Sequence, residues 1–315
     1  MKIARRGLLA TGFALPALAH AAMDEPAVER FPIWPGTPPG GEGLRVTDQV
    51  VKRSPTGPED DIAWPHVATP MLTVVRAANP NGAAVLICPG GGYTRVATGR
   101  TGSGLARMFA ARGLSAFELL YRLPHDGWAA GPDAPLQDGQ RALRLIRARA
   151  AEWRVDPARI AALGFSAGGH LAARLGSRSA LASYAPMDAI DQQSARPLVC
   201  GLFFPVITMD KTDAHPGSRQ ELLGADASPE RVRRFSAEND LPADMPPSFV
   251  SCAANDPVVP PANSLRMFAA LQAARIASEL MIFELGGHGL PMKQPDGSPH
   301  PWPELFLAFA RRHGL

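Results

Sequence analysis

Apolar runs typical of β-strands alternate with helical patterns along most of this chain. After residue 70, runs such as MLTVVRAA and AAVLICPG alternate with segments whose apolar residues recur at helical spacing. The expected strands cover 71–78, 83–90, 114–123, 159–165, 198–207, 248–254 and 278–285, and the expected helices cover 102–112, 136–153, 167–175, 263–274 and 301–312. Strands separated by helices predict an α/β fold with a mainly parallel, doubly wound sheet and helices on both faces.

Two segments depart from this alternation. Residues 22–70 are rich in proline and glycine, which predicts a leading segment that lies over the domain. Residues 212–243 form a polar insertion between two expected strands. Such an insertion usually lies over the carboxyl edge of an α/β sheet, where ligands bind, so we expect a small lid-like element there. The remainder predicts one domain over 22–315.

The first residues, MKIARRGLLATGFALPALAHAA, have a basic start, an apolar stretch and small residues near its end. This pattern predicts a signal peptide over 1–21, too short for a spanning helix. Arg5-Arg6 resembles a twin-arginine signal, and an ordinary secretory signal that contains two arginines is the alternative. We therefore expect an exported protein, periplasmic or secreted. No cysteine lies near the cleavage site, so no membrane anchor is expected.

Composition narrows the classes of partner. The net charge of +3 comes from scattered arginines without a block of like charges, which argues against nucleic acid or a membrane surface. Cys88, Cys200 and Cys252 lie in strand-like runs and are odd in number, so we expect buried free thiols. Histidines, cysteines and carboxylates show no metal-ligand spacing along the chain, and no metal site is expected. The sequence predicts no particular oligomeric state.

A serine lies between glycines where an apolar run ends and a helical pattern begins. Gly164-Phe-Ser166-Ala-Gly168 matches G-x-S-x-G, with strand RIAALGF before it and helix AGGHLAARL after it. In this context a tight turn holds the serine hydroxyl out for nucleophilic attack, and only glycine leaves room for the turn. The alternative is a serine that caps the following helix.

A serine nucleophile needs a base. His288, in FELGGHGL, follows an expected strand, and its glycines let the loop bend back over the sheet edge; His125, after YRLP, is the rival. His170 follows Ser166 on the same helix and is expected to pack against neighbouring turns. The remaining histidines of the mature chain are expected in solvated loops or near the terminus: His66, His215, His300 and His313.

The orienting acid should lie between the serine and the histidine in the chain. Asp256, in SCAANDPVVP, meets this order and directly follows an expected strand. Its carboxylate would accept the second ring N–H of His288 and stabilise the imidazolium. Asp210, after the preceding strand, is the runner-up.

A glycine run supplies candidate oxyanion donors beside the nucleophile, base and acid. CPGGGY, residues 88–93, ends an expected strand, and its glycines expose backbone N–H groups. Gly90, Gly91 and the N–H of Ala167 could together bind a tetrahedral oxyanion. A structural glycine turn or a phosphate-binding loop are the alternatives, but the lysine of a P-loop is absent.

With these motifs the chain resembles the α/β-hydrolase superfamily, in particular its secreted acetyl-esterase and acetyl-xylan-esterase-like branch. The matching stretches span nearly the whole mature chain: FPIWPG, CPGGGY, LLYRLP, residues 134–153, GFSAGGHLAARL, DPVVPPANSL and FELGGHG. CPGGGY departs from this pattern, because it has proline where many esterases have the histidine of HGGG.

The resemblance implies hydrolysis of carboxylic esters with small acyl groups, such as acetyl groups on xylan fragments, without a metal or organic cofactor. The implied roles are nucleophile for Ser166, base and then acid for His288, orienting acid for Asp256, and oxyanion donors for Gly90, Gly91 and Ala167. Tyr93 and His125 are expected in the substrate pocket. The expected partner is a small-molecule or oligosaccharide ester.

Two other functional classes are alternatives for a chain with this fold. A serine peptidase of the same fold would normally need a second domain or an acidic anchor for the peptide amine, and neither is identified in the sequence. A non-catalytic binding protein on this fold would usually have lost one of Ser166, Asp256 and His288, and all three are present.

Overall fold

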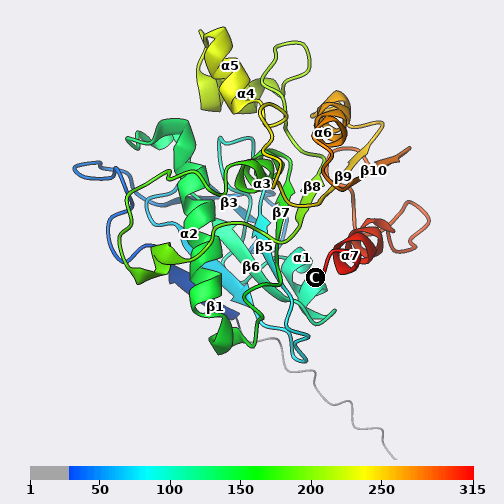
Figure 1. Cartoon of the computed structure of the whole chain (residues 1–315), viewed down its shortest axis with the longest axis horizontal. Coiled ribbons are helices and arrows are strands. Elements are labelled where there is room, and N and C mark those ends of the chain that lie inside the picture. The colour runs from blue at the N-terminus through cyan, green and yellow to red at the C-terminus, as the bar shows by residue number, and fades with distance from the viewer. Residues whose placement is uncertain (1–27) are drawn as a thin grey trace, which may run out of the picture.

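The computed structural model describes residues 28–315, so the predicted signal peptide over 1–21 lies outside the described residues. An eight-stranded sheet forms the centre, with the order β1-β4-β6-β5-β7-β8-β9-β10, and helices cover both of its faces (Figure 1). The strands from β6 to β10 in this order run parallel, whereas β1 and β4 pair antiparallel. The predicted α/β fold with a mainly parallel sheet is confirmed.

The elements agree with the predicted positions to within a few residues at most places. The strands of the main sheet are β1 (Val28–Pro32), β4 (Met71–Val75), β5 (Ala84–Cys88), β6 (Ser115–Leu120), β7 (Ile160–Phe165), β8 (Cys200–Phe203), β9 (Ser248–Ala253) and β10 (Ser278–Phe283). The helices are α1 (Gly104–Ala110), α2 (Ala134–Ala148), α3 (Ala167–Ser177), α4 (Pro216–Leu223), α5 (Pro229–Phe235), α6 (Ala262–Ala273) and α7 (Trp302–Arg312). Short 3₁₀ turns are η1 (Pro124–Asp126), η2 (Gly131–Asp133), η3 (Ala150–Trp153) and η4 (Ala189–Gln192).

The core lies on the two faces of the sheet. Alternate residues of β5 enter different clusters: Leu86 packs with the helices α2 and α3, and Val85 packs with α1 and α7. On the second face, the rings of Phe109 and Phe306 meet edge to face with centroids 6.2 Å apart. A sheet buried on both faces explains the nearly continuous apolar strands of the sequence. Within residues 28–315, no helix is long and apolar enough to cross a bilayer.

The leading segment does more than lie over the domain. β1 pairs with β4 and so becomes an edge strand of the main sheet, and β2 (Gln49–Lys52) and β3 (Ile62–His66) form a separate two-stranded sheet. Trp34 is buried, and its indole N–H donates a 2.8 Å hydrogen bond to Asp138 on α2. Buried apolar residues of the leading segment therefore belong to the core. The proline and glycine content of the segment did not indicate this.

The strand expected over 198–207 is shorter than predicted. β8 ends at Phe203, and Phe204 has φ 37°, a conformation that a non-glycine residue rarely adopts. The Phe204 N–H still donates to the carbonyl of Ser251 at 2.6 Å, so the backbone turns there while remaining attached to β9. The turn directs the chain over the carboxyl edge of the sheet.

The insertion over 212–243 contains two short helices, α4 and α5, which stand together beyond the sheet (Figure 1). His215 and Ser228 are their N-cap residues, and each accepts a hydrogen bond from a backbone N–H of the first turn. Proline follows each cap, which is its favoured position in a helix. The three cysteines are free and buried, as predicted.

Candidate active site

Ser166 occupies the turn between β7 and α3. Its backbone has φ 55° and ψ −121°, a strained conformation. A Cβ at Gly164 would lie 2.1 Å from the carbonyl oxygen of Gly168, and a Cβ at Gly168 would lie 2.0 Å from that of Cys88. Both glycines are therefore required sterically. The Ser166 side chain makes no hydrogen bond to the helix it precedes, which excludes the capping alternative.

His288 lies in the glycine-rich loop after β10. Gly286, Gly287 and Gly289 all have positive φ, so this loop needs glycine to bend back over the sheet. His288 Nε2 lies 2.9 Å from Ser166 Oγ, and Nδ1 lies 2.8 Å from Asp256 Oδ2. Because the carboxylate only accepts, Nδ1 carries the proton and Nε2 is free to accept the serine proton.

Asp256 directly follows β9, and its side chain is fully buried. Its second oxygen, Oδ1, accepts hydrogen bonds from the backbone N–H groups of Val258 at 2.8 Å and Val259 at 3.0 Å. These bonds leave Oδ2 directed at His288. Asp210, the runner-up in the sequence, instead accepts from the Thr212 N–H at 2.9 Å within its own turn.

The predicted oxyanion donors are the backbone N–H groups of Gly90, Gly91 and Ala167. Gly90 runs so close to the turn that a Cβ there would lie 3.1 Å from Ser166 Cβ, and at Gly91, φ 138°, a Cβ would lie 2.1 Å from the Arg95 carbonyl oxygen. Ala167 is the first residue of α3, where an N–H has no partner in the helix. Within residues 28–315, none of these three N–H groups donates to a backbone acceptor outside the regular elements.

Ser166 and His288 line a cavity of about 480 Å³. Its apolar lining includes Phe165 and Phe204, and Phe204 also packs edge to face on the His288 ring with centroids 4.9 Å apart. The lining also includes polar residues: Arg53, Thr94, Arg95, Ser103 and Glu118. Burial raises the pKa of Glu118, although its carboxylate accepts a hydrogen bond from the Ser103 N–H at 2.6 Å.

His215 was expected in solvent, but its side chain lines this cavity. Its Nδ1 accepts the N–H of Ser218 at 3.1 Å, so the proton of the neutral ring is on Nε2. Burial and the nearby His288 lower the pKa of His215, which keeps the ring neutral at pH 7. The sequence HPGS predicts a helix start at this position, but no local signal indicates that His215 lines the cavity.

The two residues expected in the substrate pocket lie elsewhere, and both expectations are corrected. Tyr93 is only 1% exposed, and its hydroxyl donates to Nδ1 of His170 at 2.9 Å. His170 packs in the interior as predicted, and its Nε2 donates to the Phe235 carbonyl at 2.7 Å. Burial, reinforced by Arg174, lowers the pKa of His170 to about 3. Tyr93 therefore completes a buried hydrogen-bond chain.

His125, the rival base, has partners other than Ser166. Its Nδ1 lies 2.9 Å from a carboxylate oxygen of Glu221 on α4, and its Nε2 lies 2.9 Å from the Pro65 carbonyl oxygen. It is not among the residues that line the cavity. The loop after β6 carries it towards the leading segment, which the sequence pattern did not reveal.

The chain is similar to several known proteins. It is 30% identical over 215 residues to an acetylxylan esterase of Xylanibacter ruminicola, covering 67% of this chain and 42% of that protein. The chain thus spans less than half the length of this curated relative.

Solved structures show the same architecture. An acetyl ester-xyloside bifunctional hydrolase from Caldicellulosiruptor lactoaceticus superimposes with a TM-score of 0.71 at 29% identity, over 91% of this chain and 96% of that one. MGS-M1, an α/β hydrolase from a Medee basin deep-sea metagenome library, superimposes with a TM-score of 0.59 at 21% identity, over 86% of this chain and 98% of that one. The fold is therefore that of the α/β hydrolases.

The BD-FAE family model matches residues 75–271, which is well over half of the 315 residues. The match includes the glycine run before Ser166, the G-x-S-x-G turn and Asp256, and ends before His288. The protein belongs to the BD-FAE family.

Proposed function

We propose that this protein is a serine carboxylic-ester hydrolase that acts on short-chain acyl esters, in particular acetyl groups on carbohydrate such as xylan fragments. One observation carries the proposal: Asp256 contacts His288, which contacts Ser166, in a cavity that Gly90 and Gly91 also line. A base that is itself oriented by a carboxylate is what a serine hydroxyl needs to become a nucleophile.

The reaction follows from this arrangement. His288 Nε2 takes the proton of Ser166 Oγ, which attacks the acyl carbon and forms a tetrahedral oxyanion. The N–H groups of Gly90, Gly91 and Ala167 stabilise the negative charge. The intermediate collapses as His288 returns the proton to the leaving alcohol, and an acyl-enzyme remains. Water then attacks with the same base, and Ser166 is restored.

The polar part of the cavity supports a hydroxyl-rich alcohol moiety. Arg53 and Arg95 offer hydrogen-bond donors at its wall, and His215 offers Nε2–H from the insertion. A long acyl chain would instead require a continuous apolar channel. The similarity to an acetylxylan esterase supports the same class of substrate.

We also propose that residues 1–21 are a signal peptide and that the mature protein, 22–315, acts outside the cytoplasm. The basic and apolar pattern of MKIARRGLLATGFALPALAHAA supports this assignment. Amino-terminal sequencing of the exported protein should begin near residue 22. A mature protein that retains Arg5-Arg6 would refute cleavage.

The substrate class is tested with a series of 4-nitrophenyl esters and with acetylated xylan. We expect kcat/KM to be highest for the acetate and to fall through butyrate, octanoate and palmitate, and acetate to be released from the xylan. A lipase would gain about 0.8 kcal/mol, or roughly fourfold, for each buried methylene. A maximum at octanoate or beyond would refute the short-chain proposal.

A matched pair of variants assigns the measured activity to the site. Ser166→Ala should abolish it, whereas Ser194→Ala, at an exposed position outside the cavity, should retain it. Ester hydrolysis by folded Ser166→Ala near the wild-type rate would refute the serine mechanism.

A further inference from the structure

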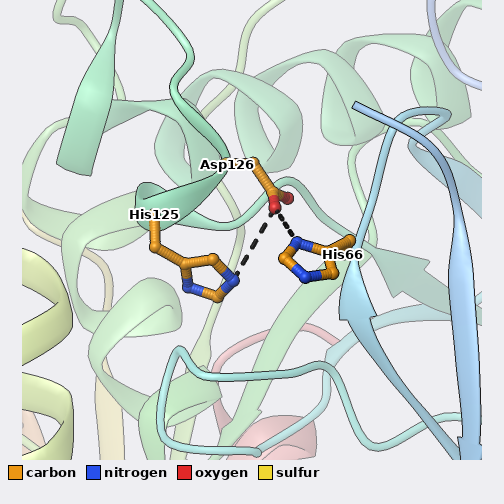
Figure 2. A group of neighbouring side chains, drawn as sticks. All are labelled: His66, His125 and Asp126. Atoms are coloured by element: carbon orange, nitrogen blue, oxygen red, sulfur yellow. Dashed lines mark hydrogen bonds and ion pairs between the residues drawn. The ribbon is translucent and has the colours of Figure 1, made fainter. Parts of the chain in front are cut away.

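Three side chains outside the proposed mechanism meet at one point in Figure 2. His66 ends β3, and His125 and Asp126 belong to η1, so the sequence separates the first residue from the others by about 60 positions. Residue spacing along the chain does not indicate this group, because its members come together only in the folded structure. We propose that His66, His125 and Asp126 bind one divalent transition-metal ion of the Zn²⁺ class, at a site separate from the cavity of Ser166.

The distances suit this class of ion. One ligand atom from each residue lies within 4.8 Å of the others. His66 Nδ1 is 2.6 Å, and His125 Nε2 is 3.6 Å, from the same oxygen of Asp126. Ligands in a tetrahedral zinc site, with bonds near 2.1 Å, are roughly 3.4 Å apart. Shifts of about 1 Å or less would therefore admit the ion between the three atoms.

The surroundings orient the ligands as in known metal sites. Asp126 is fully buried, and its other oxygen accepts the Val67 N–H at 3.0 Å, so Oδ1 is left for the histidines. His125 Nδ1 donates to Glu221 at 2.9 Å, which turns Nε2 to the side where the Pro65 carbonyl oxygen lies at 2.9 Å and Asp126 Oδ1 at 3.6 Å. A carboxylate behind a ligating histidine fixes its tautomer and raises its basicity.

Hydrogen bonding and charge both favour a cation here. Both ring nitrogens of His125 face acceptors, Glu221 on one side and Pro65 with Asp126 on the other, but a neutral imidazole has one N–H. A metal ion at Nε2 removes the mismatch. In residues 28–315, the ion pairs of Asp126 and Glu221 involve histidines alone, with no lysine or arginine. A divalent ion would balance the two carboxylates.

The ion would join three parts of the chain. His66 comes from the leading segment, His125 and Asp126 from the turn after β6, and Glu221 from α4 of the insertion. His215 lies at the other end of α4, where it faces the cavity. Metal binding would therefore stabilise the frame around the cavity and leave Ser166 uncoordinated.

The test is titration of the metal-free full chain with ZnCl₂ at pH 7.5 by isothermal calorimetry. We expect one equivalent to bind, and His66→Gln and Asp126→Asn to weaken the affinity by about 100-fold or more. His313→Gln, at the carboxyl terminus, is the matched control and should bind as the wild type does. Saturating Zn²⁺ should raise Tm by about 3–6 °C in the wild type and the control but not in His66→Gln.

Two outcomes would overturn the proposal. One is the absence of saturable binding by the wild type. The other is binding that survives His66→Gln and Asp126→Asn but is lost in His215→Gln, which would assign the ion to the catalytic cavity. The His66 side chain is 39% exposed, so His66→Gln should fold even if the buried Asp126→Asn does not. Because metal binding is measured without ester hydrolysis, the test of the metal site is independent of the proposed function.

Discussion

The pair Asp256–His288 and the pair Asp126–His66 have the same chemistry but different third partners. Each joins a buried carboxylate to an imidazole, at 2.8 Å and 2.6 Å respectively. Behind His288 lies the hydroxyl of Ser166, whereas Asp126 faces a second imidazole, His125. An aspartate–histidine pair therefore does not define a function. The third group differs, a hydroxyl beside the imidazole in one case and a second imidazole beside the carboxylate in the other, and this difference separates the proposed nucleophile from the proposed cation site.

The two sites also differ in the backbone conformation of the residues that carry them. Gly164, Gly168 and the glycines around His288 permit strained turns that direct the side chains at one another. His66 and Asp126 are absent from the positive-φ residues of the described chain, and Gly127, directly after Asp126, is a glycine that adopts its φ of 85° at little cost. Strain is tolerated where geometry must be exact for catalysis, while a metal site can adjust as the ion binds.

The largest effect should distinguish the two histidines at these sites. His288→Ala should lower kcat/KM for 4-nitrophenyl acetate by about 10⁴-fold or more, and the double variant with Ser166→Ala should lose little more, since a triad acts as one unit. His125→Ala should stay within a few-fold of the wild type. Steady-state kinetics of the purified variants checks this; a dead His125→Ala beside a live His288→Ala would reverse the assignment.

The steric requirement for glycine in the turn at Ser166 can be tested at Gly168. Gly168→Ala places a Cβ 2.0 Å from the Cys88 carbonyl oxygen, and we expect it to lower the free energy of unfolding by about 3 kcal/mol or more. Gly104→Ala, in the first turn of α1 with no atom within 4 Å of the new Cβ, is the matched control and should be neutral or stabilising. Urea unfolding measures both. Equal stabilities would show that the turn relaxes freely.

The buried His170 extends the comparison to a histidine without a carboxylate partner. Its pKa of about 3 lies below the ordinary 6.5, so the unfolded chain binds the proton more readily, and stability falls as pH falls below 6.5. Between pH 7 and pH 5 this histidine should cost about 2 kcal/mol. Urea unfolding at both pH values should show a smaller loss in His170→Gln, which cannot titrate. An identical loss in wild type and variant would contradict the assignment.

The smallest effect is expected from Tyr93→Phe. The hydroxyl bonds to His170 in the interior, so its loss should lower the free energy of unfolding by about 1 kcal/mol and change kcat/KM by less than about twofold. Thermal unfolding and ester kinetics of one preparation measure both quantities. A large rise in KM with unchanged stability would contradict this prediction and indicate that Tyr93 contacts the substrate.

Much of the fold could be predicted from local patterns. The alternation of apolar runs and helical spacing located the strands of the parallel sheet, because burial on both faces requires nearly continuous apolar residues. The structure of the leading segment could not be predicted locally, because the antiparallel pairing of β1 with β4 and the burial of Trp34 depend on partners far along the chain. Local composition carries no information about such pairings.

The sequence by itself determined the turn at Ser166 and the group around it. G-x-S-x-G is a steric requirement within five residues, and Asp256 and His288 follow strands β9 and β10 of the same parallel sheet as β7. Since the carboxyl ends of parallel strands meet at one edge, residues 122 positions apart could be expected to converge there.

Only the tertiary structure decided where His66, His125 and His215 lie. β3 belongs to a separate sheet, and α4 to an insertion, so no topological rule brings their side chains to a common edge. The direction of Tyr93 was decided in the same way, by the buried partner His170 on α3. Side-chain direction in these segments depends on packing between parts of the chain that are remote in sequence, and such packing exists only once the whole domain has folded.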